Sequence, residues 1–310
     1  MSAGTPLIAI GRSRYLFDAI ERLAQRGYAF KAIVTEEAYE EYDVKHADFE
    51  RLAARLGSAF FMTRDVDSAP IRELVAQHGI RVAVSANWKY KIAESFIGLF
   101  ECGILNLHLG NLPDYKGNAT LNWSILNGES FVNANIHKMA AELDAGDVIV
   151  RQSIPITPQT YVADLIRAAE AIAPALYEEG VARVLQDPNA CEVAGTTRGL
   201  RCYPRLPEDG LIDWRQSAEA ISRLVRASSR PYQGAFSFLD GERVTIWRAA
   251  PRVPPDRFLA VPGHVIDIDR AGGGVTVACG SGWLQLQEIE SRGDVLQPAA
   301  LIRSIRLRFK

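Results

Sequence analysis

An asparagine and a histidine two residues apart, Asn106 and His108, end a short apolar run of the sequence. Side chains alternate along a β-strand, so both point to one face while Leu105 and Leu107 point to the other. Asn is depleted in strands, so its place at the end of a buried one suggests that its amide is used. A hydrogen-bond donor beside a titratable base suits acyl transfer to an amine, which needs an oxyanion donor and a proton acceptor. Taken alone, a buried structural histidine explains His108 equally well.

A carboxylate follows further along the chain, where Asp144 and Gly146 precede the apolar run 148–150. A lone Asp-x-Gly is typical of a turn, because Asp hydrogen-bonds its own backbone there. In a site, the same carboxylate would orient and charge His108, as a third group does in triad-like arrangements. The two segments together favour a catalytic site much more than either does alone.

The elements that must position these side chains alternate between strand and helix patterns. Strand-like apolar runs cover residues 7–11, 30–34, 82–85, 104–107 and 148–150, and helical patterns cover residues 15–26, 49–56, 71–77 and 161–185. This alternation predicts an α/β fold with a Rossmann-like, doubly wound and mostly parallel sheet. Such sheets bind ligands at the carboxyl ends of their strands, where Asn106 and His108 are expected.

The last third of the sequence has a different texture. After a Gly/Pro/Arg-rich link (190–210) and one more helix (219–228), short strand-like runs cover residues 235–238, 244–247, 263–268, 275–279 and 283–286. Evenly spaced short strands predict a small antiparallel barrel. We therefore expect a catalytic domain at 1–199 and a smaller, C-terminal β-barrel domain at 200–310.

The composition is that of an ordinary globular protein. The 310 residues contain 35 Lys and Arg and 37 Asp and Glu, which gives a net charge of −2 and no general attraction to nucleic acid or anionic membrane. The four cysteines are scattered and read as unpaired thiols, and neither a signal peptide nor a membrane span is evident. These features predict a cytoplasmic enzyme with no nucleic-acid or membrane partner.

The first strand ends in Gly11, followed by Arg12, Ser13 and Arg14. The GxGxxG pattern is absent, so a bound NAD or FAD is not supported. A simple strand-to-helix turn is the favoured interpretation, and the two arginines keep an anion site open.

An acidic run occupies residues 36–50, with seven carboxylates (Glu36, Glu37, Glu40, Glu41, Asp43, Asp48 and Glu50) against Lys45. Such a run usually forms a solvated face or loop. We therefore expect this segment to lie in solvent and to repel phosphate.

Several motifs in order carry a resemblance to a known family. They are Asn106-Leu-His108, Leu112-Pro-Asp-Tyr-Lys-Gly117, Trp123, Asn127-Gly-Glu129 and Leu143-Asp144-Ala-Gly146. The sequence resembles the folate-dependent formyltransferases, which include methionyl-tRNA formyltransferase. It looks closest to those acting on nucleotide-linked amino sugars, such as UDP-4-amino-4-deoxy-arabinose. Segments such as Pro204–Gly210, Pro231–Phe236 and Gly263–Ile266 extend the likeness over nearly the whole chain, and the resemblance implies that the terminal barrel is OB-like.

The resemblance implies a role for each matching residue. Asn106 would hold the formyl oxygen, His108 would be the general base or proton shuttle, and Asp144 would support its protonated form. The donor would be 10-formyltetrahydrofolate, and no metal is used. The residues expected at the folate are Ala86, Asn87, Trp88, Met139, Glu142 and Leu143, and those expected to bind the acceptor's phosphates are Arg12, Arg14 and Lys116.

The acceptor is the part of the reaction on which the sequence is least informative. The leading hypothesis is a nucleotide-linked amino sugar, N-formylated for a surface polysaccharide such as lipopolysaccharide, because firm tRNA binding needs several cationic contacts that this chain does not suggest. Methionyl-tRNA and a small amine such as hydroxyornithine remain alternatives, as does an OB-containing binding module that has lost the reaction. The family pattern departs at Leu109-Gly110-Asn111, where Ser is common after the histidine. Many relatives are dimers, which leaves a homodimer open.

Overall fold

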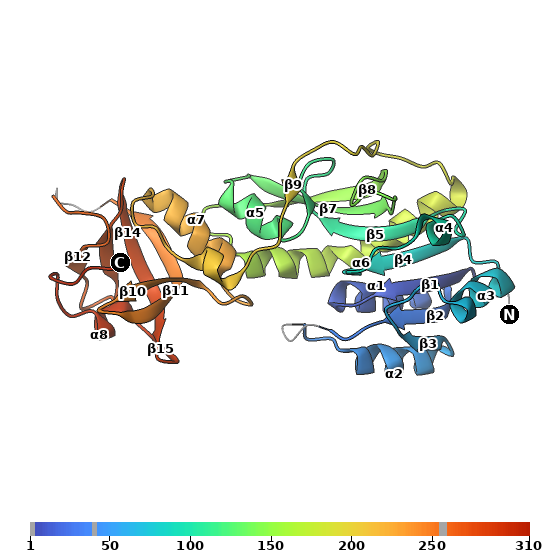
Figure 1. Ribbon diagram of the computed structural model, residues 1–310, viewed down its shortest axis with the longest axis horizontal. Helices are drawn as coiled ribbons and strands as arrows, with labels where there is room; N and C mark the ends of the chain where they lie inside the picture. The colour runs from blue at the N-terminus through green and yellow to red at the C-terminus, as the bar shows by residue number, and fades with distance from the viewer. Residues whose placement is uncertain (1–3, 39–41, 254–258) are drawn as a thin grey trace. The chain divides into compact units, whose positions relative to one another are not determined.

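The computed structural model describes residues 4–38, 42–253 and 259–310 (Figure 1). The chain divides into two compact units: Met1–Thr120, Phe131–Pro155 and Ile166–Tyr203 form the first, and Leu121–Ser130, Ile156–Leu165 and Pro204–Lys310 form the second. Two short segments inside the expected first domain thus group with the second unit. The expected boundary between residues 199 and 200 stays a prediction.

A seven-stranded sheet in the order β3-β2-β1-β4-β5-β7-β8 forms the centre of the first unit. Its strands are β1 (Pro6–Gly11), β2 (Ala29–Thr35), β3 (Ala59–Met62), β4 (Val82–Ala86), β5 (Ile104–Leu109), β7 (Phe131–Lys138) and β8 (Val148–Pro155). The first five strands of this order, from β3 to β5, pair in parallel. Strand β7 pairs antiparallel with both of its neighbours, β5 and β8. The expected α/β class with a mostly parallel, Rossmann-like sheet is confirmed, and β3 and β7 are strands that the hydrophobic pattern did not predict.

Helices cover both faces of this sheet. They are α1 (Arg14–Gln25), α2 (His46–Leu56), α3 (Ala69–His78), α4 (Glu94–Ile97) and, for most of its length, α6 (Val162–Gln186). The short α5 (Thr120–Leu126) belongs almost wholly to the second unit. Helices α3 and α4 pack on the face that carries Ile8, Ile10 and Ile104. Because side chains alternate, Asn106 and His108 point to the same face as Ile104.

The second unit contains an antiparallel sheet in the order β10-β11-β14-β13-β12, with β15 paired to β14. Its elements are η1 (Pro207–Gly210), α7 (Ala218–Ser228), β10 (Ala235–Leu239), β11 (Glu242–Arg252), β12 (Val265–Ile268), β13 (Val275–Ala278), β14 (Trp283–Ser291), β15 (Asp294–Leu296) and α8 (Pro298–Leu301). The C-terminal segment bridges both edges of the sheet, through Phe309 to Leu239 and Arg308 to His264. These two bridges bring the C-terminal segment to each edge of the sheet, as in the expected β-barrel.

No helix in the described part of the chain is long and apolar enough to span a membrane.

Candidate active site

A cleft of about 580 Å³ opens in the first unit at the carboxyl ends of β4 and β5. Asn106, His108 and Asp144 all line it, although Asp144 comes from the loop between β7 and β8. The fold therefore brings together the three side chains that the sequence singled out. Their position at strand ends is the one that parallel sheets use for ligands.

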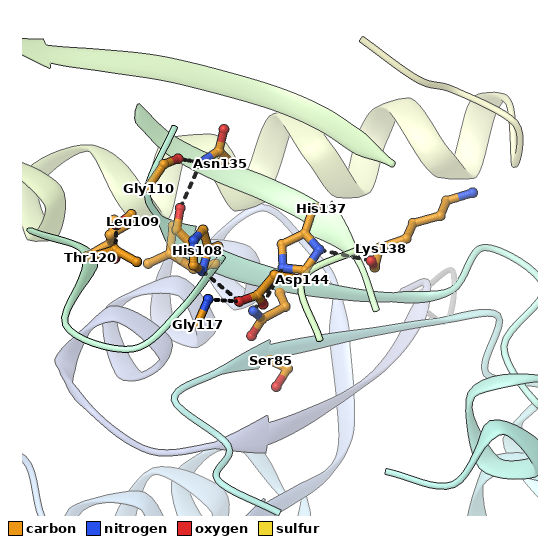
Figure 2. Close-up of polar contacts among 12 residues, drawn as sticks. Ser85, His108, Leu109, Gly110, Gly117, Thr120, Asn135, His137, Lys138 and Asp144 are labelled. Carbon is orange, nitrogen blue, oxygen red and sulfur yellow. Dashed lines mark hydrogen bonds and ion pairs between the residues drawn. The ribbon is translucent and has the colours of Figure 1, made fainter. Parts of the chain in front are cut away.

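Asp144 is the centre of the polar contacts in the cleft (Figure 2). Its Oδ2 lies 3.3 Å from His108 Nδ1 and accepts a hydrogen bond from the backbone N–H of Gly117 at 2.8 Å. Its Oδ1 lies 3.6 Å from Nε2 of a second histidine, His137. The carboxylate is almost fully buried, so these contacts replace the water that a charge of this kind needs.

The local backbone explains the Asp-x-Gly spacing. Asp144 has a φ of 51°, a left-handed conformation that Asp tolerates better than most residues. A Cβ on Gly146 would lie 1.9 Å from the carbonyl oxygen of Lys138, so only glycine allows this close approach. Asn87 and Tyr115, near the same cleft, also have positive φ values of 53° and 54°. Such strained loops are common at functional sites.

His108 is held at both ring nitrogens. Nε2 lies 2.7 Å from the carbonyl oxygen of Tyr115, and Nδ1 faces Asp144. Because each ring nitrogen faces an oxygen, these two contacts fix the orientation of the imidazole in the cleft. The ring also lies against Gly110, where a Cβ would be 2.6 Å from Nε2. Glycine at position 110 is thus required by the packing of His108.

His137 is a site residue that the sequence analysis missed. It lies on β7 directly opposite Asn106 on β5, and its Nε2 is 3.1 Å from Asn106 Nδ2. Burial lowers the pKa of His137 to about 4, although the nearby Asp144 acts to raise it. The signal that could have found it is an alternation from Val132 to His137, in which apolar and polar residues take turns as in a strand.

Five of the six residues expected at the folate line the cleft: Asn87, Trp88, Met139, Glu142 and Leu143. The sixth, Ala86, is buried at the end of β4, and its carbonyl oxygen accepts the backbone N–H of Arg12 at 3.0 Å. Trp88 and Met139 pack against the apolar cluster under α3 and α4. One wall of the cleft is therefore apolar and suited to a flat ring.

The three cations expected to bind phosphate have different positions. Arg12 lines the cleft, but its guanidinium is 2% exposed and pairs with Glu36 at 3.0 Å. Arg14 pairs with Asp43 and does not line the cleft. Lys116 is buried, and its Nζ donates to the carbonyl oxygens of Thr196 and Arg198. The positions of Arg14 and Lys116 do not support the predicted phosphate contacts.

Lys116 instead connects the Gly/Pro/Arg-rich link (190–210) to the segment that precedes Gly117, through its contacts with Thr196 and Arg198. Strand β6 (Lys116–Gly117) pairs with β9 (Arg201–Cys202), and a Cβ on Gly117 would lie 2.4 Å from the carbonyl oxygen of Cys202. The backbone N–H of Gly117 donates the hydrogen bond that Asp144 Oδ2 accepts. The link therefore supports the backbone that holds Asp144.

The expectation of a solvated acidic face is wrong for Glu36. This side chain is 4% exposed, contacts Lys89 Nζ at 2.9 Å, and accepts a hydrogen bond from Tyr90 Oη at 2.7 Å. Burial alone would raise the pKa of Glu36, but the bonds from Tyr90 and Lys89 and the charge of Arg12 hold it below its ordinary value. Glu40 and Glu41 of the same run lie outside the described residues. Arg12, Lys89 and Tyr90 all line the cleft, so Glu36 organises a cationic wall.

The fold and the site define a transferase-like α/β protein with an Asn–His–Asp cluster at the strand ends. Two family models match the chain: "Formyl transferase" over residues 17–181 and "Formyl transferase, C-terminal domain" over residues 206–306. The chain belongs to the formyl transferase family. The family predicted from the sequence motifs is therefore confirmed.

Solved structures with the same fold extend the comparison. WlaRD, a sugar 3N-formyl transferase solved with dTDP and 5-N-formyl-THF, has 13% identity and a TM-score of 0.66 over 95% of this chain and 100% of its own. The N-formyltransferase from Helicobacter canadensis, solved with folinic acid and dTDP-3-aminofucose, has 15% identity and a TM-score of 0.66 over 91% and 98%. HypX from Aquifex aeolicus, solved with tetrahydrofolic acid, has 18% identity and a TM-score of 0.62 over 97% of this chain. The chain spans about half of HypX, 47% of its length.

Proposed function

We propose that the chain transfers a formyl group from 10-formyltetrahydrofolate to the amine of a nucleotide-linked amino sugar. The observation that carries the proposal is the cluster of Asn106, His108 and Asp144 at the end of a cleft with one apolar wall. The apolar wall suits the flat pterin, and the polar cluster suits a carbonyl under attack by an amine. The folate ligands of the solved relatives support the same donor.

In this reaction the amine attacks the formyl carbon, a new C–N bond forms, and the carbonyl oxygen becomes an oxyanion. The amide of Asn106 donates to that oxygen. His108 and Asp144 act as one unit, which gives a proton to the departing N10 of the folate and takes one from the attacking amine. The bond between the formyl carbon and N10 then breaks, and the products are a formamide and tetrahydrofolate.

The placing of cations in the cleft supports an acceptor with a phosphate group. Arg12 and Lys89 both contact the carboxylate of Glu36, so two cations gather at one carboxylate. Lys91 also lines the cleft, whose carboxylates are Glu142 and Asp144. A diphosphate needs only one or two such groups, whereas tRNA needs many. We propose that Lys89 and Lys91, rather than Arg14 and Lys116, bind the phosphates of the acceptor.

The test is a set of initial rates with 10-formyltetrahydrofolate at matched ionic strength. We expect UDP- or dTDP-linked amino sugars to gain a formyl group, as read by mass, and methionyl-tRNA to react far more slowly. Lys89→Ala and Lys91→Ala should raise KM for the sugar nucleotide and leave KM for the donor nearly unchanged. Efficient formylation of the tRNA, with no turnover of any amino sugar, would contradict the proposed acceptor.

Gly110→Ala is expected to lower kcat by about 10²-fold, because displacement of a catalytic group by about 1 Å has an effect of that size. The added Cβ would lie 2.6 Å from His108 Nε2 and 2.5 Å from the carbonyl oxygen of Tyr115, so the ring must move. Gly98→Ala is the matched control, since Gly98 has a φ of −65° and a Cβ there would come no closer than 3.4 Å to its neighbours. Equal rates for both variants would show that the ring position does not depend on Gly110.

A further inference from the structure

The cleft contains a second histidine, His137 (Figure 2), which is 1% exposed. Its Nε2 lies within hydrogen-bond distance of Asn106 Nδ2. We propose that His137 is a positioning residue, whose uncharged ring accepts a hydrogen bond from Asn106 and thereby fixes the donor end of that amide in the cleft. The inference rests on the proposed function, in which Asn106 holds the formyl oxygen.

The contacts of the ring determine which nitrogen carries the hydrogen. His137 Nδ1 lies 2.9 Å from the carbonyl oxygen of Lys138, which can only accept, so Nδ1 is the donor. In a neutral ring Nε2 is then an acceptor, and it lies 3.1 Å from Asn106 Nδ2. A flipped amide would place the oxygen of Asn106 against this lone pair. The ring therefore selects one of the two amide orientations.

The surrounding charges are consistent with a neutral ring. Asp144 Oδ1, 3.6 Å away, acts to raise the pKa of His137, while burial, His108 and Lys116 act to lower it, and burial has the largest effect. Asp144 is also paired with His108 at 3.3 Å and accepts the N–H of Gly117. The two histidines therefore have different roles. His108 pairs with the carboxylate of Asp144, and His137 is the uncharged acceptor beside Asn106.

The consequence is a preorganised donor. Within the described ranges, Asn106 Nδ2 makes this one side-chain hydrogen bond, although the amide carries two N–H groups. The second N–H is left for a ligand in the cleft that Asn106 lines. A donor fixed before the reaction needs no reorganisation when the oxyanion forms.

Two substitutions separate this role from simple packing. His137→Gln can offer an oxygen near the place of Nε2, whereas His137→Leu fills the space without an acceptor. We expect kcat to stay within about tenfold for Gln and to fall about 10²–10³-fold for Leu, the range for an oxyanion donor, with little change in donor KM. The exposed His78→Leu is the control and should have wild-type kinetics.

A double-mutant cycle then tests whether His137 acts through Asn106. In the Asn106→Ala background, His137→Leu should lower kcat no further, because the group that it positions is already gone. Additive losses, or wild-type kcat for His137→Leu, would overturn the inference. Thermal unfolding of each variant shows whether the loss reflects folding.

Histidine-selective ¹⁵N NMR of the wild-type chain tests the hydrogen bond without any turnover. The signals of His137 are identified by their loss in His137→Gln. We expect a neutral ring with its hydrogen on Nδ1 at about pH 6, below the ordinary histidine pKa. A charged ring or a hydrogen on Nε2 would refute the inference. If the wild type formylates no acceptor, the proposed function fails, and this spectrum still decides the state of His137.

Discussion

His108→Ala and Asp144→Asn are each expected to lower the single-turnover rate of formyl transfer by about 10²–10⁴-fold, the usual contribution of a general acid or base. The two side chains lie 3.3 Å apart and share the proton that the reaction moves. Neither is expected to change folate affinity by much, because both are proposed to move protons at the reacting amine and N10 and not to bind the pterin ring. A fall of less than about tenfold in the single-turnover rate of either variant would show that the residue is not a general acid or base in the reaction.

Asp144→Asn is the sharper of the two variants because it keeps the structure around it. Asn tolerates the left-handed φ of 51° at this position, and its amide oxygen can still accept the N–H of Gly117. Asn lacks the charge that supports a protonated His108. Asp65→Asn serves as the control, because Asp65 is exposed and lies far from Asp144 in the sequence. Because the pair acts as a unit, the double variant should be no slower than the slower single variant.

Much of the fold could be predicted because its buried parallel strands are continuous apolar runs. Residues 82–84 form such a run, residues 104–107 are apolar except for Asn106, and both segments lie in the centre of the sheet. Strand β7 was missed because three of its buried positions are polar. The buried side-chain N–H groups of Asn135 donate to the carbonyl oxygens of His108 and Gly110, at the C-terminal end of β5. That pairing is made by distant segments, so the alternation from Val132 to His137 indicates a strand but does not indicate that its polar residues are buried.

The sequence predicted the site residues that are spaced regularly along one strand. It did not predict whether a charged residue is buried when its partners are distant in the sequence. Asn106 and His108 were found because strand alternation places them on one face. Glu36 was misjudged because its partners, Arg12 and Lys89, come from the ends of two other strands. A run of acids usually faces solvent, but the cations Arg12 and Lys89, which follow two other strands, pair with Glu36 and keep it buried.

Asn106→Ala is expected to lower kcat by about 10²–10³-fold, the range for one oxyanion donor. The loss should appear in kcat and not in the KM of the donor, because the formyl oxygen carries its charge only in the transition state. A rise in donor KM at constant kcat would instead make Asn106 a ground-state binding residue.

Asn106→Asp gives the same argument a stricter form. The carboxylate has the size of the amide but no N–H, and it would face the lone pair of His137 Nε2, which itself lies 3.6 Å from the carboxylate of Asp144. We therefore expect a loss at least as large as for Asn106→Ala, since repulsion of the oxyanion is added to the missing donor. Single-turnover rates with saturating donor measure both variants. If the Asn106→Asp variant retained a kcat close to that of the wild type, the size of the side chain rather than its hydrogen bond would be what matters at this position.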